Sequence, residues 1–549
     1  MLSLPNDIQL LIIESVNTKS ALKALCLTSQ HLRALSLPLL YHTVYLRTWD
    51  QGHKHLVCFA KSIAAGAGHH LRHTRSLSFE DDRPPSAPES ILTESSDNTR
   101  LGFRVNQDFT ARDEHVYLVL AMFPDHCLQI FRFLSERSLT SKIAELLERS
   151  QRKIVHLHFS WTCYSPRDKS PFQQTLLPPI SLRNLDIRLS CERGINPVLK
   201  EIFTKGSTLT RLSLGEQRER SPTSLGYHLL SGIVPEGVKL TNLRQLCLHH
   251  MDLSLVFPTM TTMIDFGQLF SLSVSGCDGS DSFFQELGAS LANSHASFKH
   301  IYATVSDTDC LTNVLRHCDN LTSLHLIWPE GWKETFWKMI QRIGPHLESL
   351  GLHHSRTVEP ISTNVRSIAT LQALSSCSKV RQLGIQLSHH DLDVQTWHTH
   401  HMFKAFLANL KHLPDLRTVH FRYPRWIDTS EDTLGVVAPK RWPQVTFELQ
   451  RFANVFFQFL ETRKLCPRLK CLAIGVFWEP KTSLGNFAFH IPRHCYVKGY
   501  QTDALGRTTA VGVPVSAHTL RSYEAESDIL HLDPDCEWVG SLPEHFHVS

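Results

Sequence analysis

Two stretches of the sequence decide its fold: residues 321–326, LTSLHL, and residues 347–352, LESLGL. Each has apolar residues at its first, fourth and sixth positions. Side chains alternate between the two faces of an extended chain, so the fourth and sixth residues point to one side of a short strand. The spacing occurs eleven times, in copies that begin at Ile154, Leu182, Leu209, Leu243, Leu269, Phe298, Leu321, Leu347, Val380, Leu416 and Leu469.

Six of the ten steps between these copies are 23 to 29 residues long, which is the period of a leucine-rich repeat. One repeat cannot bury its apolar face alone, so neighbouring repeats must stack. Apolar spacing typical of helices separates the copies, at 196–203, 282–291, 332–343, 365–374, 403–410 and 452–460. We therefore predict the α/β class: a leucine-rich-repeat solenoid with a parallel sheet on its concave face.

The first 46 residues have a different pattern. Apolar residues at Leu4, Ile8, Ile12 and Val16 are three or four apart, which predicts a helix with one apolar face. Two further short apolar runs predict a second and a third helix before residue 46. Three helices this short enclose a very small core, which would gain stability by docking on a partner.

This N-terminal stretch resembles the F-box-like module of fungal proteins. The resemblance rests on the Leu4-Pro5 entry with Asp7, on the apolar run after it, and on the late stretch 38–41, PLLY. It implies a three-helix F-box that binds a Skp-type adaptor and, through the adaptor, a cullin. The residues that it implies for adaptor binding are Leu4, Pro5, Ile8, Ile12, Leu22 and Leu25.

The chain is thus divided into an F-box-like domain at 1–46, a solenoid at 47–480 and a β-containing cap at 481–549. A stretch rich in Pro, Ser and charge at 81–113 is predicted to be a mobile loop. The residues after it, 114–149, have helical apolar spacing. Two alternating runs, 495–500 and 509–515, predict a hairpin that covers the open end of the solenoid.

Composition excludes several classes of protein. Apolar residues make up 42% of the chain and charged residues 20%, so a core can form. The formal net charge of +4 over 549 residues argues against a nucleic-acid-binding protein. No apolar run is long enough for a membrane helix, and the N-terminus does not resemble a signal peptide. The 14 scattered cysteines indicate free thiols in a reducing compartment, so we expect a cytoplasmic or nuclear protein.

No catalytic motif is present, so we assign no catalytic residue, expect no cofactor and expect no enzymatic activity. The strongest candidate for a metal site is the histidine-rich stretch 388–401, SHHDLDVQTWHTHH. It contains imidazole and carboxylate groups that suit zinc, but it lacks cysteine and fixed ligand spacing. We interpret it as a solvated connection and predict no metal site.

The residues between the buried strand positions are predicted to line the concave face. Aromatic residues and arginines are frequent anchors of protein interfaces, and several of the 34 histidines fall at these positions. The candidate substrate-binding residues are Arg188, Arg211, His249, Tyr302, His325, His353, His420 and Arg422.

The resemblance then implies the substrate-recognition subunit of an SCF-type (Skp-cullin-F-box) E3 ubiquitin ligase. The F-box would bind the adaptor, and the repeats would bind a protein substrate. The alternative is a leucine-rich-repeat interaction scaffold without a ligase role, in which the N-terminal helices only cap the solenoid.

Overall fold

The structure is a computed structural model, and part of the chain is described. The described residues are 4–16, 19–48, 54–80, 113–134, 139–162, 182–190, 208–216, 239–254, 257–292, 296–328, 333–354, 368–386, 401–422, 442–474 and 494–515. The chain forms two compact units, Met1–Asp265 (unit 1) and Phe266–Ser549 (unit 2), which are described separately below.

Unit 1 begins with three helices, as the sequence predicts: α1 (Asn6–Glu14), α2 (Lys19–Thr28) and α3 (Gln30–His42). Their core consists of Ile13, Leu22 and Leu32. Ser29 caps α3, because its side chain accepts a hydrogen bond from the Leu32 backbone N–H. The other helices of unit 1 are α4 (Lys54–Ala64), the 3-10 helix η1 (Ala67–His73), a helix over 113–121, α6 (Ser141–Ser150) and α9 (Phe257–Met263).

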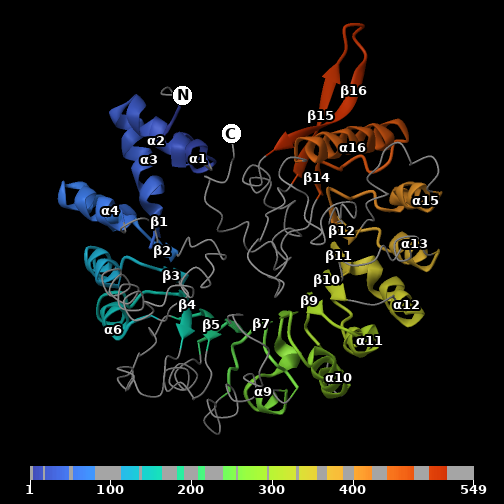
Figure 1. The fold of residues 1–549 in the computed structure, drawn as a ribbon, viewed down its shortest axis with the longest axis horizontal. Coiled ribbons are helices and arrows are strands. Elements are labelled where there is room, and N and C mark those ends of the chain that lie inside the picture. The colour runs from blue at the N-terminus through green and yellow to red at the C-terminus, as the bar shows by residue number, and fades with distance from the viewer. Residues whose placement is uncertain are drawn as a thin grey trace, which may run out of the picture. The chain divides into compact units, whose positions relative to one another are not determined.

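The sheet of unit 1 is parallel, and its strands follow one another in chain order (Figure 1). They are β1 (Thr43–Arg47), β2 (Ser76–Glu80), β3 (Ile130–Leu134), β4 (His156–Thr162), β5 (Asn184–Ser190), β6 (Arg211–Glu216) and β7 (Gln245–His249). Aligned apolar residues form buried rows across the strands; one row runs through Phe131, Leu157, Leu185 and Leu212. These rows give the sheet one apolar face, which α4 and α6 cover.

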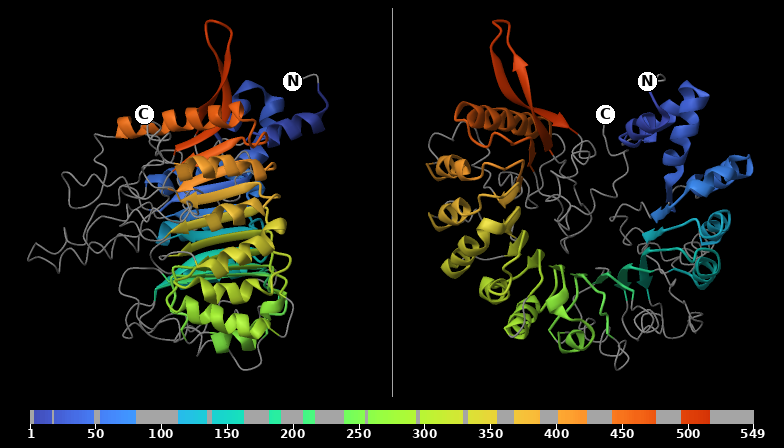
Figure 2. Two further views of the ribbon diagram at one scale, coloured as in Figure 1. Left: turned by 90° about the vertical axis from the view of Figure 1, so that its right-hand side faces the viewer. Right: turned by 180° about the vertical axis from the view of Figure 1, so that it is seen from behind.

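Unit 2 repeats the same arrangement of a strand followed by a helix (Figure 2). Its parallel strands are β8 (Ser271–Ser275), β9 (His300–Thr304), β10 (Ser323–Trp328), β11 (Ser349–His354), β12 (Gln382–Gln386), β13 (Thr418–Arg422) and β14 (Cys471–Ile474). The helices on one face are α10 (Ser280–Leu291), α11 (Thr308–Leu315), α12 (Glu334–Ile343), α13 (Ile368–Ser375), α15 (His401–Asn409) and α16 (Trp442–Thr462). Short 3-10 helices η4 (Phe266–Gln268), η5 (Gly344–His346) and η6 (Leu410–His412) complete the connections.

The predicted hairpin is present at the end of unit 2. Strand β15 (His494–Thr502) pairs antiparallel with β14 and with β16 (Thr508–Val515), so the hairpin continues the sheet. Its turn is held by the Asp503 carboxylate, which accepts hydrogen bonds from the backbone N–H groups of Leu505 and Arg507. Gly506 has φ +76° in this turn, a conformation that glycine adopts without strain.

The repeat spacing predicted strands β4 to β14 at their observed positions, but it did not predict β1, β2 and β3. The prediction of helical spacing throughout 114–149 is wrong in part, because β3 occupies Ile130–Leu134 between a helix at 113–121 and α6. The reason is that Phe131 and Phe133 alternate at strand spacing, and both are buried in the sheet.

Several predictions fall outside the described residues: the loop over 81–112, the helix at 196–203 and the histidine-rich stretch up to residue 400. The helices predicted at 282–291, 332–343, 365–374, 403–410 and 452–460 correspond to α10, α12, α13, α15 and α16. The domain boundaries at 46 and 480 remain predictions. Within the described part of the chain, no helix combines the length and apolarity that a bilayer crossing requires.

Candidate functional site

The sheet face of unit 1 that lies opposite its helices carries polar groups from four neighbouring strands. One cross-strand row contains His156, Asn184 and Arg211, and the next contains Arg132, His158 and Asp186. We call these six residues the polar face of unit 1. Arg132 is exposed, while His156, Asp186 and Arg211 are half-buried, so solvent and ligands can reach this face.

A histidine–carboxylate contact and a second, perturbed histidine define the electrostatics of the polar face. His158 Nδ1 lies 3.3 Å from Asp186 Oδ2. Burial, together with the positive charges of Arg132 and Arg211, lowers the pKa of His156 to about 4, although Asp186 opposes this shift. His156 is therefore a neutral imidazole at pH 7, and the two arginines lie close enough to act on it.

Of the candidate substrate-binding residues in unit 1, Arg211 and His249 are half-buried on the predicted face. Arg188 occupies the expected strand position, next to Ser160 and Gly215 in the register. Sequence reasoning did not select Arg132 or His156. The repeat spacing at Leu128, Phe131 and Phe133 was the signal that could have placed Arg132 on this face.

On the corresponding face of unit 2, a tyrosine ring and three histidine rings pack against one another in a buried row. Tyr302, His325, His353 and His420 come from four strands, and successive ring centroids are 5.0, 4.7 and 5.5 Å apart. All four side chains are buried, with at most 4% of their surface exposed. They lie on the strand face predicted from the sequence, where they pack on one another and are buried.

Two glycines make room for this row. His325, Gly351, Gly384 and His420 align in the register, so the two middle positions have no side chain. His353, two residues beyond Gly351 on the same face, contacts both outer histidines and so fills the space above the glycines. The last candidate, Arg422, occupies the final position of β13.

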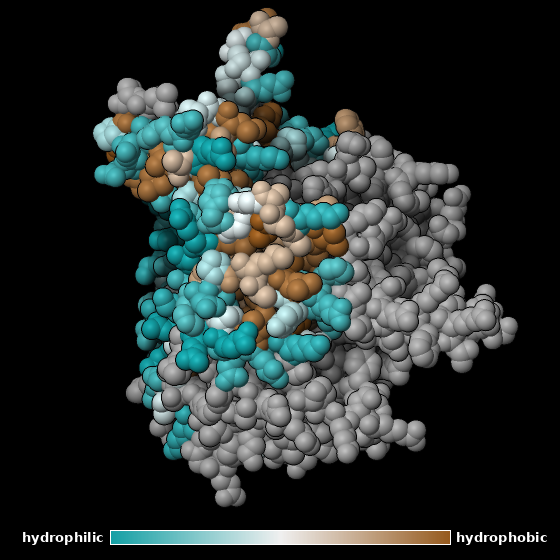
Figure 3. All heavy atoms as spheres, turned by 90° about the vertical axis from the view of Figure 1, so that its left-hand side faces the viewer, coloured by the Kyte–Doolittle hydropathy of each residue, from teal (hydrophilic) through white to brown (hydrophobic). Residues whose placement is uncertain are grey.

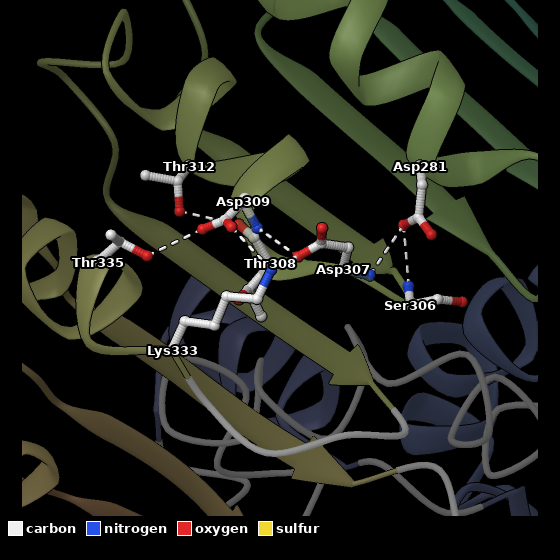
Figure 4. A network of polar contacts seen from close by, with 8 residues as sticks. All are labelled: Asp281, Ser306, Asp307, Thr308, Asp309, Thr312, Lys333 and Thr335. Atoms are coloured by element: carbon white, nitrogen blue, oxygen red, sulfur yellow. Dashed lines mark hydrogen bonds and ion pairs between the residues drawn. The ribbon is translucent and has the colours of Figure 1, made fainter.

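A polar network joins three successive connections of unit 2 (Figure 4). The Asp281 carboxylate in α10 accepts hydrogen bonds from the backbone N–H groups of Ser306 and Asp307, which follow β9. Asp307 in turn caps α11 by accepting a hydrogen bond from the Asp309 N–H.

Lys333, directly before α12, closes this network. Its ammonium group lies 2.7 Å from carboxylate oxygens of both Asp307 and Asp309. Thr335 Oγ1 also donates to Asp309, and the hydrogen bonds from Lys333 and Thr335 lower the pKa of that carboxyl group. The carboxylates accept hydrogen bonds from backbone N–H groups of the network and pair with the Lys333 ammonium group. The network therefore stabilises the connecting loops and is not an open cation site.

Helix α1 presents an exposed apolar surface on unit 1. Leu4, Ile8, Leu11 and Ile12 are 39 to 60% exposed. We call these four residues the α1 apolar face. Figure 3 views the side of the molecule on which the N-terminal helices lie, and hydrophobic residues reach the surface there beside hydrophilic ones. Apolar side chains grouped at a surface mark a place where a partner can bind.

The buried side of α1 explains this exposure. Gln9 is 2% exposed; its amide donates to the Leu4 carbonyl, and its side-chain oxygen accepts from His31 Nε2. Gln9 and Ile13 thus take the inner positions of the helix, which turns the apolar residues at 8, 11 and 12 outward.

The expected adaptor-binding residues therefore separate into two groups. Leu4, Pro5, Ile8 and Ile12 are exposed, whereas Leu25 is half-buried against the helix core. Leu22 is 6% exposed and packs in the core, and its part in adaptor binding stays a prediction. Two further leucines of the N-terminal helices, Leu11 and Leu27, are also exposed.

No group of three or more histidine, cysteine or acidic residues is placed to bind a metal ion within the described residues. The cysteines of the described ranges are free thiols. Cys466 and Cys471 are buried.

No protein-family model matches the chain, and no curated protein matches its sequence significantly. The α1 apolar face and the two sheet faces are the features of the molecule that bear on its function.

Proposed function

We propose that the chain is the substrate-recognition subunit of an SCF-type E3 ubiquitin ligase. In this proposal, the N-terminal helices are an F-box that binds a Skp-type adaptor, and the strand–helix repeats are a leucine-rich-repeat solenoid that binds a protein substrate. The protein brings the substrate close to the ubiquitin-transferring enzyme and performs no chemistry itself.

The observation that carries the proposal is the α1 apolar face. A helix in a three-helix unit would normally turn its apolar side inward, because burial stabilises it by about 25 cal/mol per Å² of apolar surface. Here Gln9 takes an inner position with its amide satisfied, while Ile8, Leu11 and Ile12 face out. This arrangement favours a second protein as the element that covers the helix.

The repeats support the second half of the proposal. Eleven copies of one apolar spacing correspond to parallel strands β4 to β14, each presenting a face opposite the helices. Such a face offers side chains from many strands to one partner, which suits the recognition of a protein segment.

A pull-down with a purified Skp-type adaptor tests the adaptor half. We expect the wild type to retain the adaptor and the double variant Ile8→Glu with Leu11→Glu to lose it, because both carboxylates would have to be desolvated in the interface. Both positions are exposed, so the variant should keep the wild-type melting temperature.

Leu118→Glu is the matched control, since Leu118 is also an exposed leucine of unit 1, at 53%, but lies outside α1. It should bind the adaptor as the wild type does. If the wild type itself retains no adaptor, the ligase proposal fails, and an interaction scaffold becomes the better explanation of the repeats.

A further inference from the structure

Strand β15 is longer than β14, the strand beside it. It has nine residues, whereas β14 has four and pairs only with the first part of β15, from His494 to Val497. Within the described residues, the last backbone contact on this side is the hydrogen bond from the Lys498 N–H to the Lys470 carbonyl. In both views of Figure 2, the hairpin extends beyond α16. The second half of β15 thus has a neighbouring strand on one side only, which is β16.

The free side of β15 offers two residues to a further strand, Tyr500 and Thr502. The Asp503 N–H donates to the Arg507 carbonyl, so these two residues form a hydrogen-bonded pair of the hairpin. Hydrogen-bonded and non-hydrogen-bonded pairs alternate along an antiparallel ladder. Tyr500 and Thr502, like Lys498, therefore turn their backbone N–H and C=O groups away from β16. Both residues are exposed, and no hydrogen-bond partner of these backbone groups lies within the described residues.

The opposite edge of the hairpin, on β16, is protected. The Gly512 N–H donates to Asn454 Oδ1 in α16, and the Gly512 carbonyl accepts from Gln450 Nε2. Ala510 is 2% exposed, and Pro514 has no N–H to offer. Covering elements and prolines are usual protections of an edge strand against pairing with another chain. The free half of β15 has neither.

We propose that two copies of the chain form a dimer by pairing the free halves of their β15 strands antiparallel. One register uses both available residues, with Tyr500 of each copy opposite Thr502 of the partner subunit. A shift by two residues would need Lys498, whose N–H is already bonded, or the turn of the hairpin. The two-fold axis then passes between the two copies of Gln501.

The chemistry of this segment favours a second copy over a different protein. Residues 499–502, GYQT, carry no charge, so self-pairing brings no like charges together. The charged groups beside it are paired within one chain, Asp503 with Arg507 and Lys498 with Glu461. Tyrosine opposite threonine is an aromatic–β-branched pair, which stabilises a sheet. The interface is small, so the dimer should depend on concentration. It does not depend on the proposed ligase role.

The first test is a disulfide between the two copies. Gln501→Cys places two thiols on the two-fold axis, in a non-hydrogen-bonded pair whose Cα atoms lie about 4.5 Å apart, which suits a disulfide. Thr509→Cys is the matched control, because Thr509 is exposed and pairs with Gln501 across the hairpin. Its two copies would lie three strand spacings, or about 14 Å, apart. Both variants carry Cys58→Ser, which removes an exposed thiol.

We expect mild oxidation to link the Gln501→Cys protein into a dimer and to leave the Thr509→Cys protein a monomer. Mass spectrometry of the digested dimer identifies the linkage at residue 501.

Analytical ultracentrifugation of the full-length protein measures the dimer without crosslinking. We expect the mean mass of the wild type to rise toward that of a dimer over about a hundredfold range of concentration. Gln501→Lys brings two ammonium groups face to face and should weaken the dimer about fivefold, whereas Thr509→Lys should not. Both positions are exposed, so both variants should keep the wild-type melting temperature.

A wild type that stays monomeric at every concentration would overturn the proposal and leave a strand of another protein as the occupant of this edge. Equal linkage of the two cysteine variants would also overturn it. So would a dimer that Gln501→Lys and Thr509→Lys weaken equally, because its interface would then lie elsewhere.

Discussion

The imidazole of His325 lies directly against the backbone of Gly351 on the neighbouring strand. A methyl group at Gly351 would come within 2.5 Å of His325 Nδ1. The ring cannot move aside freely, because Tyr302 and His353 pack against it. Glycine at position 351 is therefore a packing requirement of the buried row of rings.

We expect Gly351→Ala to lower the free energy of unfolding of unit 2 by about 1–3 kcal/mol, the cost of overpacking a close-packed interior. The measurement is urea unfolding followed by circular dichroism. The double variant with His325→Ala is the control, since removing the ring makes room for the methyl group. Strictly additive effects of the two substitutions would contradict the contact.

The network around Lys333 predicts a local effect. Lys333→Met removes the ammonium group shared by Asp307 and Asp309 and leaves the two carboxylates to repel each other. We expect faster backbone hydrogen exchange over 305–312, measured by mass spectrometry, with little change elsewhere. All groups in the network are near the surface, so global stability should change little.

Lys338→Met is the matched variant, because Lys338 forms an ion pair with Glu334 on the exposed surface of α12, the helix that follows Lys333. It removes the same charge without touching the loops after β9. Unchanged exchange over 305–312 in Lys333→Met would show that the backbone hydrogen bonds to Asp281 alone hold this segment.

The sequence was sufficient for the parts of the fold in which apolar residues recur at fixed spacing. Leu324 and Leu326 predicted β10, and the same spacing predicted ten further strands. Strands β1 and β2 were not predicted, because they begin at Thr43 and Ser76, shortly after helical segments. Short apolar runs in such places can equally be helical.

The functional surfaces were harder to predict, because face and exposure are different properties. Alternation placed His325 and His353 on the correct face, but it could not show that glycines at 351 and 384 let the rings pack together. Similarly, the helical spacing placed Leu22 on an apolar helix face, but it could not show that this side chain lies in the core. The burial of a side chain depends on the side chains of the neighbouring strand or helix. The sequence of one segment alone does not show which side chains those are.

Thiol reactivity provides a prediction on packing. Burial raises the pKa of Cys127 to about 11 and of Cys318 and Cys377 to about 12, whereas Cys58 is exposed. Since the thiolate is the reactive form, a maleimide at pH 7.5 should label Cys58 rapidly and the other three only after unfolding. Mass spectrometry of digested samples identifies each site.

Cys58→Ser serves as the control and should remove this rapid labelling without changing the other three sites. Labelling of Cys318 or Cys377 in the folded protein at the rate of Cys58 would contradict their buried positions in unit 2.

The polar face of unit 1 predicts a loss of stability in acid. The pKa of His156 is about 4 in the folded protein and about 6.5 when the chain is unfolded, so folding favours the neutral ring. The resulting stabilisation is complete above pH 6.5 and is lost as the pH falls toward 4. Arg132, Arg211 and Asp186 are the charged groups that act on this ring.

We expect the wild type to lose on the order of 1 kcal/mol more than His156→Gln between pH 7 and pH 5, since the half-buried ring is partly screened by solvent. The difference is measured by urea unfolding at both pH values. Hydrogen exchange of the backbone amides of β4 and β5 reports the unfolding. Gln keeps a polar side chain of similar size but does not titrate, so other histidines contribute equally to both proteins. Parallel pH profiles of the two proteins would contradict the lowered pKa of His156.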